Sequence, residues 1–78
     1  MGSLIPLHHL SIGSSGQVRK LTANGSTRRR MLDLGLIQGT RVEALQKSPS
    51  GDPIAYEIRG AVIALRSEEA SQILVELV

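Results

Sequence analysis

Apolar and polar side chains alternate most clearly over residues 54–59. A period of two is typical of a half-buried strand, so it predicts that Ile54, Tyr56 and Ile58 face a core. After a turn comes an almost uninterrupted apolar run over 61–66, AVIALR, which predicts a strand buried on much of both faces. The short connection between the two segments predicts an antiparallel hairpin.

Weaker strand patterns occur in four other segments, 4–10, 17–22, 40–47 and 73–77. The first contains Pro6, which favours an edge position because proline cannot donate to a sheet. The second places Val18 and Leu21 out of step with a period of two, which predicts a bulge. The residues expected to face the core from these segments are Leu4, Leu7, Leu10, Val18, Val42, Ala44, Ile73, Val75 and Leu77.

A helix is predicted over about 26–34, between an Asn-Gly turn signal and a glycine. Ser26 is expected to be its N-cap, because a serine hydroxyl can accept a free N–H of the first turn. Gly35 is expected to end the helix in the left-handed conformation, with Leu36 packing back on Met31 in a Schellman motif. The apolar side of this helix is expected to consist of Met31, Leu32 and Leu34.

Turn and helix signals complete the predicted architecture. Gly39 is expected to supply the positive φ of a type II turn that starts at Ile37, and a helical turn capped by Ser67 is predicted near 67–72. Short strands with turns between them favour a mainly β fold, a small barrel of about five strands with the longer helix inserted. All 78 residues are expected to form one domain, with residues 1–3 disordered or a cloning remnant.

The composition narrows the class of protein. A formal charge of +2 is too small for a strong field that attracts nucleic acid. Tyr56 stands alone among Phe, Trp and Tyr, so the core must be mostly aliphatic and no exposed base-stacking platform is expected. The absence of cysteine excludes disulfides and thiolate metal sites. No apolar run approaches the ~20 residues that cross a membrane, and residues 1–7 lack the basic start and the longer apolar run of a signal peptide.

The sequence contains no recognisable catalytic or tight metal-binding pattern. His8 and His9 are the only histidines. Adjacent side chains in an extended segment point to opposite faces, so the two imidazoles are not expected to coordinate the same metal ion. The GSSG sequence at 13–16 lacks the lysine and the helix of a phosphate loop. Asp52 lies between a glycine and a proline, which is more typical of a turn than of an acidic site. Neither an enzyme nor a tightly bound cofactor is predicted.

Three consecutive arginines stand at the start of the predicted helix, where positive charge opposes the helix dipole. Two interpretations of them stay open. They are a solvated helix face, or they dock an acidic partner together with apolar side chains of the next turn, since arginine is enriched at interfaces and charge steers encounter. The residues of this hypothetical partner-binding surface are Arg28, Arg29, Arg30, Leu36 and Ile37.

Several short motifs follow one another along the chain: LDLGL at 32–36, GT at 39–40, GDPI at 51–54, RG at 59–60, ALR at 64–66 and EA at 69–70. In this order and spacing they resemble the ferrous iron transport protein A (FeoA) family, in its small free-standing form, over about residues 7–75. The resemblance implies an SH3-like barrel in which the glycines shape the backbone and Leu32, Ile63 and Leu65 fill the core. Family members often have proline where this chain has Ile12 and Gln38. The motif residues expected to be structural are Leu32, Gly35, Gly39, Gly51, Asp52, Pro53, Gly60 and Leu65.

The resemblance also implies a function. It predicts a non-enzymatic cytosolic accessory of a bacterial ferrous iron transport system, with the GTPase-containing membrane transporter as partner and without nucleic acid or direct membrane insertion. One alternative is a sensor or delivery module with a weak divalent-metal (Fe²⁺) site. A second alternative is a nucleic-acid-binding small barrel, which the salt dependence of DNA and RNA binding would identify.

Overall fold

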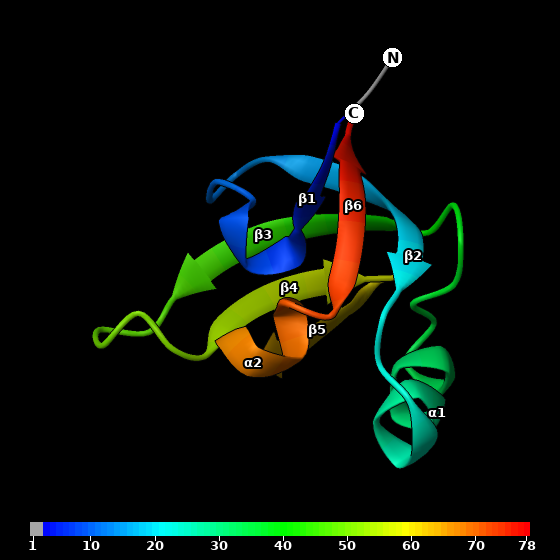
Figure 1. Cartoon of the computed structure of the whole chain (residues 1–78). Coiled ribbons are helices and arrows are strands. Elements are labelled where there is room, and N and C mark those ends of the chain that lie inside the picture. The colour runs from blue at the N-terminus through cyan, green and yellow to red at the C-terminus, as the bar shows by residue number, and fades with distance from the viewer. Residues whose placement is uncertain (1–2) are drawn as a thin grey trace.

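The computed structural model describes residues 3–78. Met1 and Gly2, part of the start that was expected to be disordered or a cloning remnant, lie outside the described residues. Nine elements follow one another along the described chain (Figure 1). In order they are β1 (Leu4–Pro6), the 3-10 helix η1 (Leu7–His9), β2 (Ser15–Leu21), α1 (Gly25–Asp33), β3 (Arg41–Lys47), β4 (Ile54–Ile58), β5 (Ala61–Leu65), α2 (Ser67–Ala70) and β6 (Ile73–Leu77).

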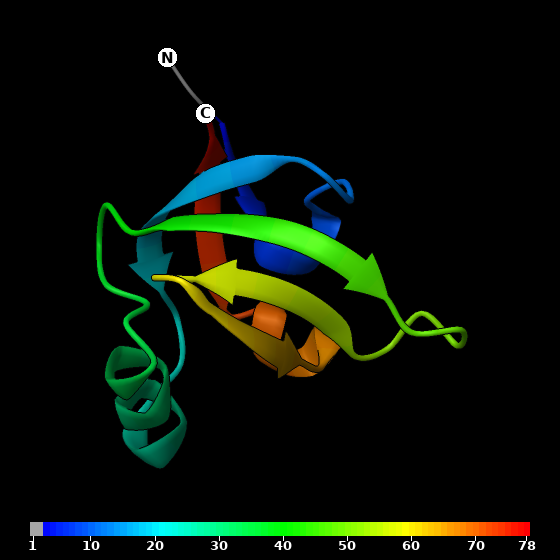
Figure 2. The ribbon, with the colours of Figure 1, turned by 180° about the vertical axis from the view of Figure 1, so that it is seen from behind.

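The six strands form one antiparallel sheet in the order β1-β6-β2-β3-β4-β5. The sheet curls strongly around its own inner face, while α1 lies to one side of it on the connection from β2 to β3 (Figures 1 and 2). The sheet has six strands where about five were expected, because β1, which includes Pro6, pairs with β6 over three residues. Its predicted edge position is confirmed.

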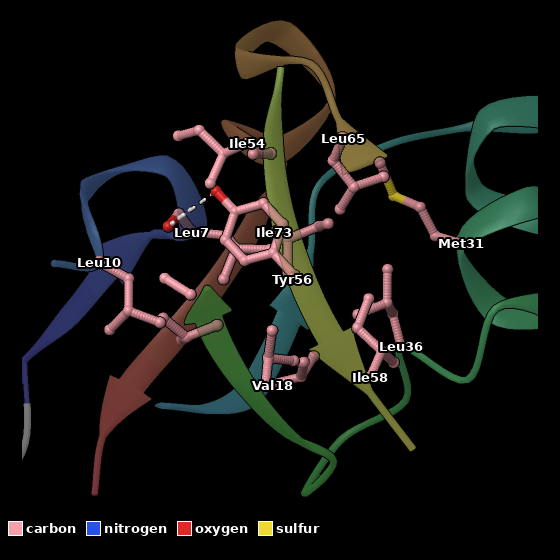
Figure 3. Packing of buried hydrophobic residues seen from close by; sticks show 14 of the residues in the cluster. Leu7, Leu10, Val18, Met31, Leu36, Ile54, Tyr56, Ile58, Leu65 and Ile73 are labelled. Atoms are coloured by element: carbon pink, nitrogen blue, oxygen red, sulfur yellow. Dashed lines mark hydrogen bonds between the residues drawn. The ribbon is translucent and has the colours of Figure 1, made fainter. Parts of the chain in front are cut away.

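The core lies inside the curl and is almost wholly aliphatic. Tyr56 is fully buried in the middle of it, and its hydroxyl donates to the backbone carbonyl of Leu7 at 3.5 Å (Figure 3). Ile54 and Ile58 flank Tyr56 on β4, as the alternation predicts. The buried apolar residues are Leu7, Leu10, Val18, Ala23, Met31, Leu36, Val42, Ala44, Ile54, Tyr56, Ile58, Leu65, Ala70, Ile73 and Val75.

Burial of Tyr56, with the negative charge of Asp52 as a second cause, raises the pKa of the phenol to about 12. The neutral ring is therefore favoured by folding, and its contribution to stability is complete below about pH 10 and is lost as pH rises toward the folded-state pKa. A shift of this size corresponds to about 2–3 kcal/mol. We expect urea unfolding of the wild type to show this loss between about pH 10 and pH 12.

The matched control is Tyr56→Phe, which keeps the ring and removes the titrating hydroxyl. Its free energy of unfolding should fall less over the same alkaline range, because the variant has no phenol to ionise on unfolding. Equal losses in the two proteins would show that the phenol is not shielded from water.

Two corrections concern the outer strands. The run 61–66 is not buried on both faces: β5 is the last strand of the sheet, and Val62 on its outer face is 69% exposed. Leu4 and Leu77 were expected inside but are 46% and 60% exposed, because each lies at the end of a strand where the curl no longer covers it. The predicted bulge in β2 is confirmed by a register shift between Val18 and Lys20.

The cap of α2 differs from the prediction. Arg66, rather than Ser67, is the N-cap residue, and its N–H is accepted by Glu69 at 3.1 Å. The Asp52 carboxylate accepts both the backbone N–H and the hydroxyl of Ser67, at 2.7 and 3.1 Å. Asp52 therefore satisfies a free donor of the helix start from a loop fifteen residues earlier in the chain.

Candidate functional site

Helix α1 ends in the predicted Schellman motif. The N–H of Leu36 donates to the Met31 carbonyl and that of Gly35 donates to the Leu32 carbonyl, both at 3.0 Å, with Gly35 at φ +94°. Met31 and Leu36 are buried together, as the motif requires. At its other end the helix begins at Gly25 with Asn24 as N-cap, so the expectation for Ser26 is wrong.

The turn after the helix is also as predicted. Gly39 has φ +92°, and the N–H of Thr40 donates to the Ile37 carbonyl at 3.0 Å. The Thr40 hydroxyl donates to the Gly35 carbonyl at 2.8 Å, which ties the turn to the helix end. These bonds hold Ile37 outward, at 46% exposure.

An apolar ridge results from this geometry. Leu32 is 40% exposed and Ile37 is 46% exposed, and both line each of two hollows on α1. One hollow, about 370 Å³, lies against β2 and has Arg19, Lys20 and Arg28 in its wall. The other, about 440 Å³, includes side chains of β4 and β5. We call these two exposed side chains the Leu32/Ile37 ridge.

The three arginines do not form one surface. Successive residues of a helix point about 100° apart, so they diverge. Arg28 donates to the Leu21 carbonyl at 3.3 Å and lines the hollow beside the ridge. Arg30 forms an ion pair with Glu69 of α2, and Arg29 is exposed. The Arg19 guanidinium is engaged by Glu76 at 2.8 Å, so Lys20 and Arg28 are the cations best placed to meet a partner.

The ion pair with Arg30 contributes to a lowered pKa of the Glu69 carboxylate. Burial alone raises the pKa of Glu69, but the Arg66 N–H bond and the Arg30 guanidinium outweigh burial and lower it. The ionised form is therefore favoured by folding, and this contribution is lost as pH falls through the lowered pKa. The Arg30 ion pair ties α1 to α2, and a role of Arg30 in docking a partner stays a prediction.

The predicted partner-binding surface is therefore corrected in part. Arg28 and Ile37 line one hollow, and their role in binding a partner stays a prediction. Leu36 is fully buried, because the Schellman contact with Met31 takes it inward, and so it cannot contact a partner. Leu32 was expected in the core and is instead on the ridge: it is the sequence neighbour of Met31, and α1 turns only one narrow side to the sheet.

The remaining motif residues behave as structural elements. Positive φ values at Gly51 and Gly60, +88° and +85°, shape the loop before β4 and the turn after it. Asp52 caps α2 from that loop, next to Pro53. Leu65 is buried, and Ile63 packs partly against the core.

The two histidines lie in η1 rather than in an extended segment, and their ring centroids are 4.3 Å apart. The Nδ1 atom of His8 is buried without a hydrogen-bond partner. Burial, and to a lesser extent the neighbouring His9, lowers the pKa of His8. No group of three or more His, Cys, Asp or Glu side chains suited to a metal ion occurs among residues 3–78.

Neither does the surface offer a platform for nucleic acid bases. Tyr56 is buried as predicted, and the sequence has no other Phe, Trp or Tyr. What the Leu32/Ile37 ridge can do is pack against an apolar patch of another protein, with Lys20 and Arg28 nearby to meet acidic groups.

Comparisons with known proteins identify relatives over almost the whole chain. The FeoA domain family model matches residues 5–77. A fusion protein of Fe(2+) transport protein A and the Fe(2+) transporter FeoB from Porphyromonas gingivalis is 32% identical over 72 residues, which are 92% of this chain. The chain spans only 8% of the length of that fusion protein.

Solved structures of FeoA proteins are also similar to this chain. An FeoA-like protein from Clostridium acetobutylicum is 37% identical, with a TM-score of 0.91 over 100% of this chain and 91% of that one. The zinc complex of Stenotrophomonas maltophilia FeoA, described as an SH3 domain protein, is 30% identical, with a TM-score of 0.80 over 88% of this chain and 86% of that one. The predicted SH3-like, mainly β fold is therefore confirmed. In the part of the chain that is described, no helix has the length and apolarity to cross a bilayer.

Proposed function

The chain belongs to the FeoA domain family, and on this basis we propose that it is a non-enzymatic cytosolic accessory of a ferrous iron transporter. Membership of the family implies an accessory role in ferrous iron transport. The proposal adds a mechanism: the domain docks on the GTPase-containing membrane transporter through the Leu32/Ile37 ridge and so regulates or assembles it.

Two observations support this docking role. In the Porphyromonas gingivalis relative, the transport protein A part and the transporter are one polypeptide, which would hold the two permanently together. In this chain, two large aliphatic side chains stay exposed at the helix end beside the basic side chains of Lys20 and Arg28. The exposed ridge is the observation that carries the proposal, because aliphatic side chains with a basic rim are typical of an interface rather than of a catalytic site.

Ferrous iron uptake in cells tests the proposed role. Cells that contain the transporter and lack this chain should take up iron slowly, and the wild-type chain should restore uptake. A Leu32→Asp, Ile37→Asp variant should fail to restore it although it accumulates to the same level. Full restoration by that variant would contradict docking through the ridge.

A weak metal site is the second candidate function, since the His8 and His9 rings lie side by side and the Stenotrophomonas relative was solved with zinc. Two histidines supply fewer ligands than the three or four of a tight zinc site, so we expect no Fe²⁺ or Zn²⁺ binding tighter than about micromolar. Calorimetry of the isolated domain measures this. Tighter binding that disappears in a His8→Ala, His9→Ala variant would favour metal sensing or delivery.

A further inference from the structure

The free edge of β5 carries unpaired backbone groups in a defined pattern. Arg59 and Gly60 form a two-residue hairpin loop with φ values of +52° and +85°, as in a type I′ turn. The closing pair of such a turn, Ile58 with Ala61, exchanges backbone hydrogen bonds, and the bonded pairs recur at every second residue. The N–H and C=O groups of Val62 and Ala64 therefore point away from β4.

Nothing in the described chain covers that side. β5 is the last strand of the sheet, with no further strand beside it (Figure 2). The backbone hydrogen bonds outside the regular elements include none to Val62 or Ala64. Val62 is 69% exposed, and Ala64 is exposed as well. Four backbone groups thus remain open to water or to another strand.

The two edge strands differ in the residues that would hinder pairing with a foreign strand. The other edge strand, β1, is three residues long and includes Pro6, which limits pairing with a foreign strand. β5 is five residues long, AVIAL, with neither a charge nor a proline. Natural edges usually carry such protection because an open edge is a template for pairing. Its absence on β5 alone points to a strand partner there.

The charges at the two ends of β5 indicate the chemistry of the partner. Arg59 precedes the strand, and Arg66 follows it with a side chain 65% exposed and only a 4.0 Å contact to Asp52. Pairing of two copies of β5 in antiparallel register would bring Arg59 of one copy close to Arg66 of the other at both ends. Like charges opposite one another are destabilising, so a second copy is disfavoured.

We propose that the free edge of β5 binds an extended segment of a partner protein by strand addition, the segment being apolar in its middle and acidic at both ends. The main-chain groups of Val62 and Ala64 provide the affinity, and Arg59 and Arg66 select the acidic ends. Arg59 and Ala61 also line one of the two hollows at the Leu32/Ile37 ridge, so the two surfaces adjoin. Val62 and Ala64 line neither hollow, so a change at Val62 tests the edge without altering the ridge on which the proposed function rests.

An NMR titration tests the edge. The probe is a short synthetic peptide of alternating valine and threonine with two glutamates at each end, and the matched probe has lysines in their place. We expect saturable shifts and slower hydrogen exchange at the Val62 and Ala64 amides with the acidic peptide, and affinity lower by about tenfold or more with the lysine peptide. Absence of shifts at millimolar acidic peptide, or shifts centred elsewhere, would overturn the proposal.

Variants separate strand addition from simple charge attraction. Val62→Pro removes an N–H that points away from β4, so the hairpin keeps its bonds, and we expect affinity to fall by about tenfold or more, whereas Val62→Thr should bind as wild type. If Val62→Pro does not fold, the Arg59→Asn, Arg66→Gln variant provides the test, because asparagine tolerates the positive φ. It should bind more weakly at low salt. Unchanged binding in a folded variant, or self-association of the wild type through β5, contradicts the proposal.

Discussion

Replacing Leu36 with alanine is expected to destabilise the domain by about 2–5 kcal/mol, whereas the same change at Leu32 should cost about 1 kcal/mol or less. Leu36 is fully buried and closes the Schellman end of α1, so its truncation leaves a cavity between the helix and the sheet. Leu32 is 40% exposed on the ridge and leaves no enclosed space. For a domain of this size, the larger loss is a substantial part of the total stability.

Urea unfolding of the two variants beside the wild type measures the difference. The midpoint should fall strongly for Leu36→Ala and little for Leu32→Ala, with similar slopes in all three proteins. A Leu32→Ala protein as unstable as Leu36→Ala would show that α1 packs with the other face against the sheet, and the ridge would then not exist.

The Leu32→Asp, Ile37→Asp variant is expected to bind the transporter's cytosolic GTPase domain at least about a hundredfold more weakly than the wild type does. Each substitution replaces an exposed aliphatic side chain by a charge that would have to be buried in the interface. The fold should survive, because neither side chain contributes to the buried core. Biolayer interferometry with the immobilised GTPase domain gives the two affinities.

The matched control is Leu77→Asp, Val78→Asp. These side chains are also exposed, at 60% and 68%, but they lie at the end of β6 rather than on α1. This control should bind as well as the wild type. If both variants lose affinity equally, general surface hydrophobicity rather than the ridge is responsible for binding.

The sequence predicts β4 well and β5 poorly for the same physical reason. β4 lies inside the sheet with one face on the core, and the alternation of apolar and polar residues along it correctly predicts which side chains are buried. The continuous apolar run of β5 is equally compatible with a two-sided strand and with an edge strand that exposes Val62. Only the strand order, which depends on pairing between distant segments, decides between them.

The end of α1 shows which structural features the local sequence predicts and which it does not. The spacing of Gly35, Leu36 and Gly39 correctly predicts the Schellman motif and the turn, because those hydrogen bonds join close neighbours in sequence. The same motif requires Leu36 to be buried, so its assignment to a partner surface conflicted with a local rule. Which of Met31 and Leu32 faces the sheet depends on how the helix docks, and the local pattern does not contain that information.

The polar contacts could not be predicted in the same way. Arg30 pairs with Glu69 across 39 residues of sequence, and Asp52 caps Ser67 across 15. Both contacts exist because the curl of the sheet brings α2 close to α1 and to the loop before β4. The docking role of Arg28 remains a prediction, whereas that of Arg30 is weakened by its ion pair.

The most direct test of the docking proposal is an NMR titration of isotope-labelled wild-type domain with the cytosolic GTPase domain of the transporter, in both its GDP and its GTP-analogue forms. We expect saturable amide shifts or line broadening centred on residues 32–37 and on Arg28 in at least one nucleotide state. Saturable changes confined to other surfaces, or no change in either nucleotide state, would contradict the account.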